Sequence, residues 1–427
     1  MKKIFTCLCS LTFLTVSNTF LKAQAVQYLH QIIVANGGVF EFGPTYNDRA
    51  TVATFNPQTN SYTIFDTIEV ESVQDVIIDS IYAYVAAQDS IVKYNLNTYQ
   101  REAIAYFPNI KKLEIAGNYL MVGKWFGGGD YFAVFNKHNL QEIFSISQVN
   151  ETVNGMALLN DTFYVAYNIK GTIDLFPPWG VYADSIGKLA VIHASSQTFL
   201  HDIILGPNAA GAGKSFVYNN SIYTICIETG YLFKYTPTNG NIDSLNIGII
   251  KYANLHNGIL YGDFFTGFGA YNLNTNAFLS NPSFSYSSMY AAINYDFMNN
   301  HFYVTETDYS TYGKLYKINN SGLKTDSVNV GISPEAMALD FRLNVSINEI
   351  ENKKIISAYP NPFNNSITLQ GRENASVEVY DLKARLIYQT QSLSNTHLIN
   401  TENWESGMYI IKVQSNTDVQ TLKMIKQ

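Results

Sequence analysis

One pattern of strands and turns repeats through most of the chain, and this repeat restricts the fold more than any other feature. In the clearest unit, residues 75–80, 81–88, 90–98 and 101–107 each form an apolar or Tyr- and Val-rich stretch that ends at a polar turn. The next unit, 112–147, has the same rhythm. Four such strands make one small antiparallel sheet, so the repeat predicts a ring of sheets, a β-propeller.

Further units begin near Gly155, Lys214, Lys251 and Met289, so that unit starts are roughly 36 to 60 residues apart. Composition agrees with this interpretation. Aromatic residues make up 14% of the chain, led by 31 Tyr and 26 Phe, and these residue types suit a pleated, half-buried surface. With 47% hydrophobic and only 14% charged residues, the chain is too apolar to be disordered. We therefore expect an all-β protein.

The two ends of the repeat region each supply part of one unit. Residues 31–38, 50–59 and 61–67 are typical of second, third and fourth strands, but no first strand precedes them. Residues 334–341 are typical of a first strand that nothing follows. Because an open ring leaves unpaired sheet edges, we expect these pieces to share one sheet.

The sequence thus predicts a seven-bladed β-propeller over residues 26–345, closed by pairing 335–340 beside 31–36. Two separate β-sandwiches are the alternative. The stretch Ile32–Gly38, followed by Val52–Pro57, resembles the YVTN-type propellers of surface-layer and related exported bacterial proteins. This resemblance implies a fold and says little about a ligand.

Residues 355–427 differ in character from the repeats. They begin with the segment Tyr-Pro-Asn-Pro at 359–362, continue with a hairpin-like pair of strands at 376–390, and end in a strand after Trp404 and a Lys-rich terminus. The residues that carry this motif set are Tyr359, Pro360, Asn361, Pro362, Gly407, Tyr409, Lys423 and Lys426. Residues 346–354 are polar and charged, which is typical of a linker.

Together these motifs resemble the type A sorting domain of the type IX secretion system. The resemblance implies a small C-terminal antiparallel β-sandwich, a partnership with the type IX secretion machinery, and a passenger that is released or kept at the cell surface. The turn after Asp381 departs from the family, because Leu382–Arg385 stands where glycine is frequent. An ordinary adhesive β-sandwich is the alternative.

Residues 1–25 are typical of a cleaved signal peptide. Lys2 and Lys3 precede an apolar stretch from Ile4 to Val16, and Ala23-Gln24-Ala25 forms a small-x-small cleavage pattern. A buried N-terminal helix is the alternative. Cleavage would remove three lysines and no acid, which changes the formal net charge from −7 to −10.

Charge and cysteine content exclude several classes of protein. An acidic chain without a basic run is a poor partner for nucleic acid. After residue 25 no apolar run is long enough to span a bilayer, so we expect no integral membrane protein. Only Cys226 would remain in the mature chain, so no intrachain disulfide forms, and its strand-like surroundings predict a buried thiol.

Known catalytic patterns are absent from the sequence. It contains no HExxH, CxxC, GxSxG or P-loop, and its seven histidines show no ligand spacing. Gly127–Asp130 resembles a cation loop but lacks alternating aspartates. We therefore predict no catalytic residue, no metal site and no cofactor.

In a propeller, the loops from strand two to strand three lie on one face, together with the loops that lead to the next blade. Several of these loops carry aromatic side chains, which suit glycan or peptide contacts. The predicted ligand-binding residues are Arg49, Trp125, Phe126, Asp130, Trp179, Phe265, Tyr309 and Tyr312. The alternative is that these aromatics only cap the blades.

The sequence favours an exported, non-catalytic module that binds an extracellular glycan or protein. An enzyme on a propeller scaffold, acting on extracellular polysaccharide or another extracellular substrate, is the first alternative; it requires ionisable groups that converge on the central channel. A structural or adhesive surface protein is the second.

Overall fold

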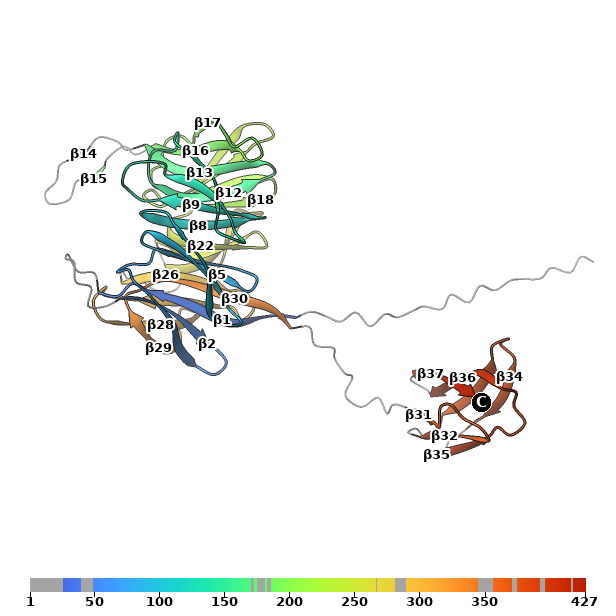
Figure 1. Cartoon of the computed structure of the whole chain (residues 1–427). Helices are drawn as coiled ribbons and strands as arrows, with labels where there is room; N and C mark the ends of the chain where they lie inside the picture. The colour runs from blue at the N-terminus through green and yellow to red at the C-terminus, as the bar shows by residue number, and fades with distance from the viewer. Residues whose placement is uncertain are drawn as a thin grey trace, which may run out of the picture. The chain divides into compact units, whose positions relative to one another are not determined.

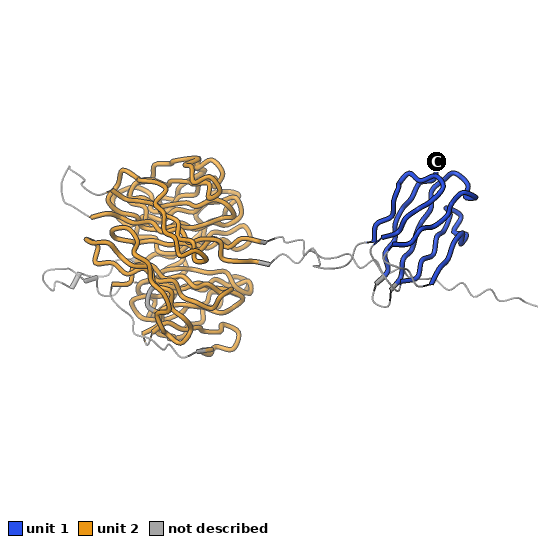
Figure 2. Tube along the Cα trace, turned by 90° about the horizontal axis from the view of Figure 1, so that it is seen from below, with its two compact units in different colours: residues 1–24, 345–427 blue, residues 25–344 orange. Residues whose placement is uncertain are grey.

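The chain is seen in a computed structural model, which divides it into two compact units, residues 25–344 and a unit containing residues 345–427 (Figure 2). The structure describes residues 26–39, 49–169, 173–174, 181–182, 186–265, 267–280, 289–344, 356–370, 375–391, 396–415 and 418–427. Within these ranges all regular structure is strand, and no helix long and apolar enough to cross a membrane occurs. The predicted signal peptide and linker lie outside them.

Four-stranded antiparallel sheets build the first unit, and each sheet but one follows chain order from its first strand to its last. Six of these sheets are β4 (Asp75–Asp79), β5 (Tyr82–Ala87), β6 (Ser90–Asn95), β7 (Gln100–Tyr106); β8 (Ile110–Ala116), β9 (Tyr119–Lys124), β10 (Phe132–Asn136), β11 (Glu142–Ile146); β12 (Val153–Leu159), β13 (Thr162–Ile169), β16 (Ile186–His193), β17 (Thr198–Ile204); β18 (Ala212–Tyr218), β19 (Ser221–Cys226), β20 (Tyr231–Thr236), β21 (Asn241–Asn246); β22 (Ile249–His256), β23 (Ile259–Phe264), β24 (Gly267–Asn272), β25 (Ala277–Ser280); and β26 (Tyr290–Asp296), β27 (His301–Glu306), β28 (Tyr312–Asn319), β29 (Lys324–Ile332). A short ribbon, β14 (Ile173–Asp174) with β15 (Val181–Tyr182), is inserted between β13 and β16.

The remaining four-stranded sheet of this unit joins the two ends of the repeat region. Its strands, in order, are β3 (Ser61–Ile68), β2 (Ala50–Asn56), β1 (Val26–Asn36) and β30 (Pro334–Asn344). β30 lies antiparallel to β1, with Gln31 opposite Asp340 and Ala35 opposite Ala336 (Figure 1). The predicted pairing of 335–340 beside 31–36 is confirmed, and the unit has a propeller-like, all-β fold.

Hydrophobic side chains fill the space between neighbouring sheets. One core cluster combines Tyr84 and Ile91 of one sheet with Leu120 and Phe135 of the next, all almost fully buried. Burying an aliphatic or aromatic side chain of this size contributes about 1.5–3 kcal/mol. The middle strands are covered on both faces by apolar neighbours, which explains why β5 and β19 are buried along almost their whole length, whereas the outer strands β7 and β21 are largely exposed.

The first strand of each sheet has one edge that no strand pairs. Side chains from the preceding sheet satisfy many of the exposed backbone groups along this edge. The bonds are Val73 N to Glu335 Oε2 (3.2 Å), Leu113 N to Asp75 Oδ2 (3.1 Å), Asn154 Nδ2 to Ala212 O (3.2 Å), Tyr295 N to Asn254 Oδ1 (3.1 Å) and Asn294 Nδ2 to Met337 O (2.7 Å). Because an unpaired buried backbone group is costly, these bonds hold neighbouring sheets in register.

The second unit is a small antiparallel β-sandwich. One sheet contains β31 (Ser357–Tyr359), β32 (Ser366–Gln370) and β35 (Thr396–Asn400); the other contains β34 (Leu386–Thr390), β33 (Ser376–Asp381), β36 (Gly407–Ser415) and β37 (Asp418–Lys426). Residues of both sheets share one core, with Ile367, Val379 and Ile411 buried between them. The predicted hairpin at 376–390 is the pair β33 and β34.

The Tyr-Pro-Asn-Pro segment of this unit packs against its last strand. Asn361 accepts a hydrogen bond from the backbone N–H of Ile425 (2.9 Å) and donates one to the carbonyl of Lys423 (3.1 Å). Lys426 is buried and donates to the carbonyl of Asn364. These bonds join the Tyr-Pro-Asn-Pro motif to the Lys-rich terminus of the chain, which explains why the two motifs occur together in one domain.

The turn that lacks the expected glycine is stabilised by its aspartate. Ala384 has a φ of 59°, a left-handed conformation that costs a non-glycine residue roughly 1 kcal/mol. The carboxylate of Asp381 accepts the backbone N–H groups of Lys383 and Arg385, both at 2.9 Å, and pairs with the Arg385 side chain. These bonds lower the pKa of Asp381, because they favour its charged form.

Candidate functional site: the central channel

A cavity of about 1000 Å³ lies along the first strands of the sheets in the first unit. Residues from β4, β8, β12, β18, β22, β26 and β30 line it, so it is the central channel of the ring. A volume of this size accommodates a small ligand or a short chain end. At the end where the first strands begin, Trp125 and Tyr309 lie at its edge, and we call this end the channel mouth.

Trp125 follows β9 directly, in the loop that leads to β10. Its backbone N–H donates to the carbonyl of Asn109 at 2.9 Å, which fixes the loop beside β8. The indole is 51% exposed, Phe126 meets it edge-on at 5.7 Å, and the Lys111 ammonium lies 5.4 Å from the ring centre. A large exposed ring offers a flat contact surface to a ligand.

Tyr309 lies in the loop between β27 and β28, with a φ of 63°. Thr307 Oγ1 accepts its backbone N–H (2.9 Å), and Asp308 accepts those of Ser310 (2.9 Å) and Thr311 (2.7 Å). Through these bonds the pKa of Asp308 falls to about 2. These bonds hold a half-exposed tyrosine at the mouth, and its partial burial and the nearby Glu335 raise the pKa of its hydroxyl.

Four charged side chains lie along one part of the channel wall. Lys112 on β8 pairs with Asp75 on β4 at 3.6 Å. Glu114 on β8 and Lys214 on β18 interact electrostatically across the glycine-bearing strand β12. Burial raises the pKa of Glu114 to about 7, although Lys214 opposes this shift, and burial lowers the pKa of Lys214, although Glu114 opposes that.

The opposite part of the wall comes from β22, β26 and β30 and is aromatic and amide-rich. Tyr252 donates its hydroxyl to the carbonyl of Ala291, and Asn254 donates to Asn294 at 3.0 Å. Tyr295 stacks on Tyr261 with ring centres 3.7 Å apart. This wall offers flat surfaces and neutral polar groups, whereas the wall of β4, β8 and β18 offers charges.

Of the predicted ligand-binding residues, the structure brings Trp125 and Tyr309 to the channel. The others that it describes lie elsewhere: Phe126 beside Trp125, Asp130 as acceptor of the Ser145 hydroxyl, Arg49 in an ion pair with Glu69, Phe265 over Gly230 and Gly248, and Tyr312 at the start of β28, 74% exposed. Trp179 lies outside the described residues. The structure thus places two of the expected aromatic residues, Trp125 and Tyr309, at the channel mouth.

The charged residues inside the channel were not among the predicted site residues. Asp75, Lys112, Lys214 and Glu335 lie at or near the beginning of a first strand, and Glu114 lies further along β8. The available signal was a charged residue within the otherwise apolar first strand of a repeat unit. Such a position is expensive to bury unless it faces water or a ligand.

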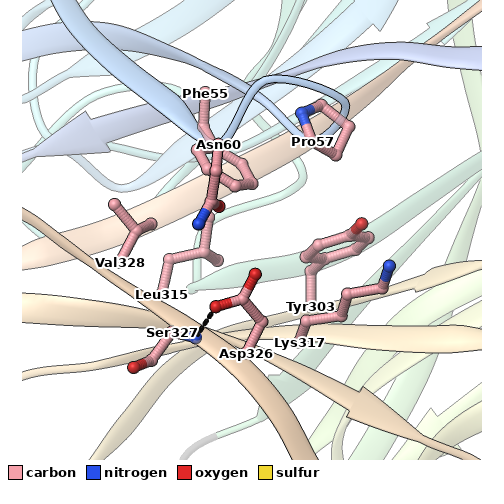
Figure 3. A pocket seen from close by; sticks show the side chains of 9 residues that line it. All are labelled: Phe55, Pro57, Asn60, Tyr303, Leu315, Lys317, Asp326, Ser327 and Val328. Carbon is pink, nitrogen blue, oxygen red and sulfur yellow. Dashed lines mark hydrogen bonds between the residues drawn. The ribbon is translucent and has the colours of Figure 1, made fainter.

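A second, much smaller cavity lies where the closing sheet meets the sheet of β26–β29. Phe55 and Pro57 face Tyr303, Leu315 and Lys317 around it (Figure 3). Its volume is about 30 Å³, enough for water and too small for an organic ligand. It is therefore a packing defect of the closure.

The described residues offer neither a cluster of metal ligands nor a reactive thiol. These residues contain no group of three or more His, Cys, Asp or Glu side chains that could hold a metal ion. Cys226 is a free, buried thiol, as predicted, and burial raises its pKa to about 12. A thiol with so high a pKa is a poor nucleophile.

The family comparison decides the nature of the second unit. Residues 357–427 match the family model of the secretion system C-terminal sorting domain. The predicted type IX sorting domain is confirmed. It directs the chain through the outer membrane, to the cell surface or the medium.

Curated protein sequences include no match to the chain. Similar solved structures include PorZ, a surface component of the type IX secretion system of Porphyromonas gingivalis (12% identity, TM-score 0.32, 88% of this chain and 73% of that one). They also include the RRP9 WD40 repeats (10% identity, TM-score 0.42, 61% of this chain and 81% of that one). A third is the extracellular domain of a putative hybrid two component system, BT4673, from B. thetaiotaomicron (11% identity, TM-score 0.47, 94% of this chain and 59% of that one).

Proposed function

We propose that this exported chain is a non-catalytic binding module that captures an extracellular glycan or protein at the mouth of its central channel. The observation that carries the proposal is the channel of about 1000 Å³ with the exposed rings of Trp125 and Tyr309 at its edge. Exposed aromatic rings beside a cavity with polar groups are the usual form of a ligand site. The fixed loops that carry them require no ordering on binding, which favours affinity.

The same proposal assigns the parts of the chain. Residues 1–25 are the signal peptide, 26–345 a seven-bladed propeller, 346–354 a linker and 355–427 the sorting domain. Support for the blade number comes from the four-stranded sheets of the first unit and from the pairing of β1 with β30.

Binding by the full-length purified chain to an array of extracellular glycans and peptides tests the proposal. We expect Trp125→Ala and Tyr309→Ala each to weaken binding at least tenfold, because each removes a contact surface at the mouth. Tyr106→Ala is the matched control, since Tyr106 is 72% exposed on the outer strand β7. A bound ligand whose affinity is the same in all three variants would contradict the proposed site.

A second candidate is an enzyme that acts on extracellular polysaccharide. The observation in its favour is Glu114, whose pKa of about 7 suits a general acid or base, beside the charged Lys214. Incubation of the chain with the polysaccharides it binds separates the two candidates. New reducing ends or unsaturated products that disappear in Glu114→Gln would establish the enzyme.

A further inference from the structure

Glu114 and Lys214 differ from the other polar side chains of the first strands in the bonds they form. At most junctions, an acidic or amide side chain of one first strand bonds to the backbone of the next, as Asp75 does to Leu113 and Asn154 to Ala212. Glu114 and Lys214 form no such bond between sheets. Within the described residues, the Lys214 ammonium interacts with the Phe216 ring (5.5 Å) and with nearby charges, and donates no hydrogen bond.

Strand β12, whose sheet lies between those of the two charges, packs closely against β18 at a glycine. Gly155 on β12 lies so close to β18 that an added Cβ would be 2.0 Å from the carbonyl oxygen of Gly213. Glu114, Gly155, Gly213 and Lys214 all line the channel. The cavity of about 1000 Å³ along which both charged side chains lie leaves room for a ligand group beside them.

The chemistry of the wall selects a class of ligand. Asp75 and Glu114 can accept hydrogen bonds from a ligand, Lys112 and Lys214 can donate them, and each acid interacts with one of the lysines. A hydroxyl group is donor and acceptor at once, so vicinal hydroxyls match alternating carboxylates and ammonium groups. A ligand with a net charge would gain from one pair member and be repelled by the other.

We propose that the charged wall is a subsite for the end of a neutral glycan chain, whose hydroxyls bond to Glu114 and Lys214 while a sugar ring stacks on Trp125 at the mouth. This inference rests on the proposed function and names its ligand class. Asp75 and Lys112 hold the next hydroxyls along the wall. The amide wall, with Asn254 and Asn294, limits the width of the chain that enters.

The experiment measures the binding of the full-length chain to neutral oligosaccharides, to uronate-containing oligosaccharides and to peptides with free termini, by calorimetry. The variants are Glu114→Gln, Lys214→Met and the double variant, which removes both charges together and leaves no unpaired one. The control is Glu378→Gln with Lys412→Met, a Lys–Glu pair (3.1 Å) in the second unit. We expect neutral oligosaccharides to bind, with a loss of at least tenfold in each channel variant and none in the control.

Three outcomes would overturn the inference, and they are distinguishable. Neutral glycans that need Trp125 and bind equally well without the two charges would place the ligand outside the channel and leave the proposed function standing. Peptides or uronates that bind in place of neutral glycans would overturn the ligand class. Absence of binding to every probe would overturn both proposals. Thermal melting of each variant without ligand identifies any that fail to fold.

Discussion

Replacing Asn294 by Ala tests how the ring is held closed. Asn294 on β26 accepts a hydrogen bond from Asn254 (3.0 Å) and donates one to the carbonyl of Met337 on β30 (2.7 Å). The variant loses both bonds and leaves the Met337 carbonyl and the Asn254 amide without these partners. Each lost bond costs about 1 kcal/mol, and an unsatisfied buried partner costs up to about 3 kcal/mol more.

The channel reduces this penalty, because its volume of about 1000 Å³ admits water to both exposed groups. We therefore expect Asn294→Ala to lower the free energy of unfolding by about 2 kcal/mol. Asn254→Ala loses the shared bond and the one from Tyr295 N (3.1 Å), so its cost is similar. Since the two residues share one bond, the double variant should cost about 1 kcal/mol less than the sum.

Scanning calorimetry of the full-length chain measures these effects. The two units have separate cores, so we fit two transitions rather than one. The transition of the first unit should move down by roughly 3 °C, because the unfolding entropy of so large a unit is high, and that of the second unit should stay fixed. Asn239→Ala is the control, because the Asn239 side chain accepts one hydrogen bond, from Asn241 N (3.1 Å), in an exposed turn. Losses below about 0.5 kcal/mol, or fully additive losses, would refute the reasoning.

Three further predictions concern the interior. Gly155→Ala should prevent folding or lower the free energy of unfolding by more than about 4 kcal/mol in urea titrations, because the new methyl group meets the Gly213 carbonyl. A soluble variant of native stability would contradict this prediction. The pKa of Glu114 is raised to about 7 in the folded chain, so between about pH 4.5 and 7 the folded chain keeps a proton that the unfolded chain has lost. The contribution of Glu114 to stability is therefore complete below about pH 4.5 and is lost as the pH rises through 7. The stability of wild type relative to Glu114→Gln should therefore fall by roughly 3 kcal/mol over this window, and a flat difference would count against it. Cys226 should react with iodoacetamide at pH 8 only after denaturation, and rapid labelling of the native chain would show that the thiol is exposed.

Local patterns were sufficient to predict the strands and the closure. A first strand at 334–341 and the missing first strand before 31–38 could be seen without coordinates, because an unpaired edge requires a partner. The Tyr-Pro-Asn-Pro segment and the final strand were predicted as parts of one domain by their motif spacing, and the structure joins them through Asn361.

The candidate site was predicted only in part. Trp125 and Tyr309 were found because they stand in loops between the second and third strands, and loop position follows from strand count. Phe265 and Tyr312 were expected at the same site, but packing over Gly248 and a place at the start of β28 keep them out of the channel lining. Side-chain direction depends on each loop's local bonds, which strand count does not determine.

By itself, the sequence determined the all-β class, the sorting domain and the joining of the chain's two ends in one sheet, because these follow from short-range periodicity, turn chemistry and the pairing that an open edge demands. Only the tertiary structure decided that Asp75, Lys112, Glu114 and Lys214 meet in one channel. Those residues stand on three different sheets, and their proximity depends on the register between sheets and on two glycines that let backbones approach. Such long-range geometry leaves no local pattern in the chain.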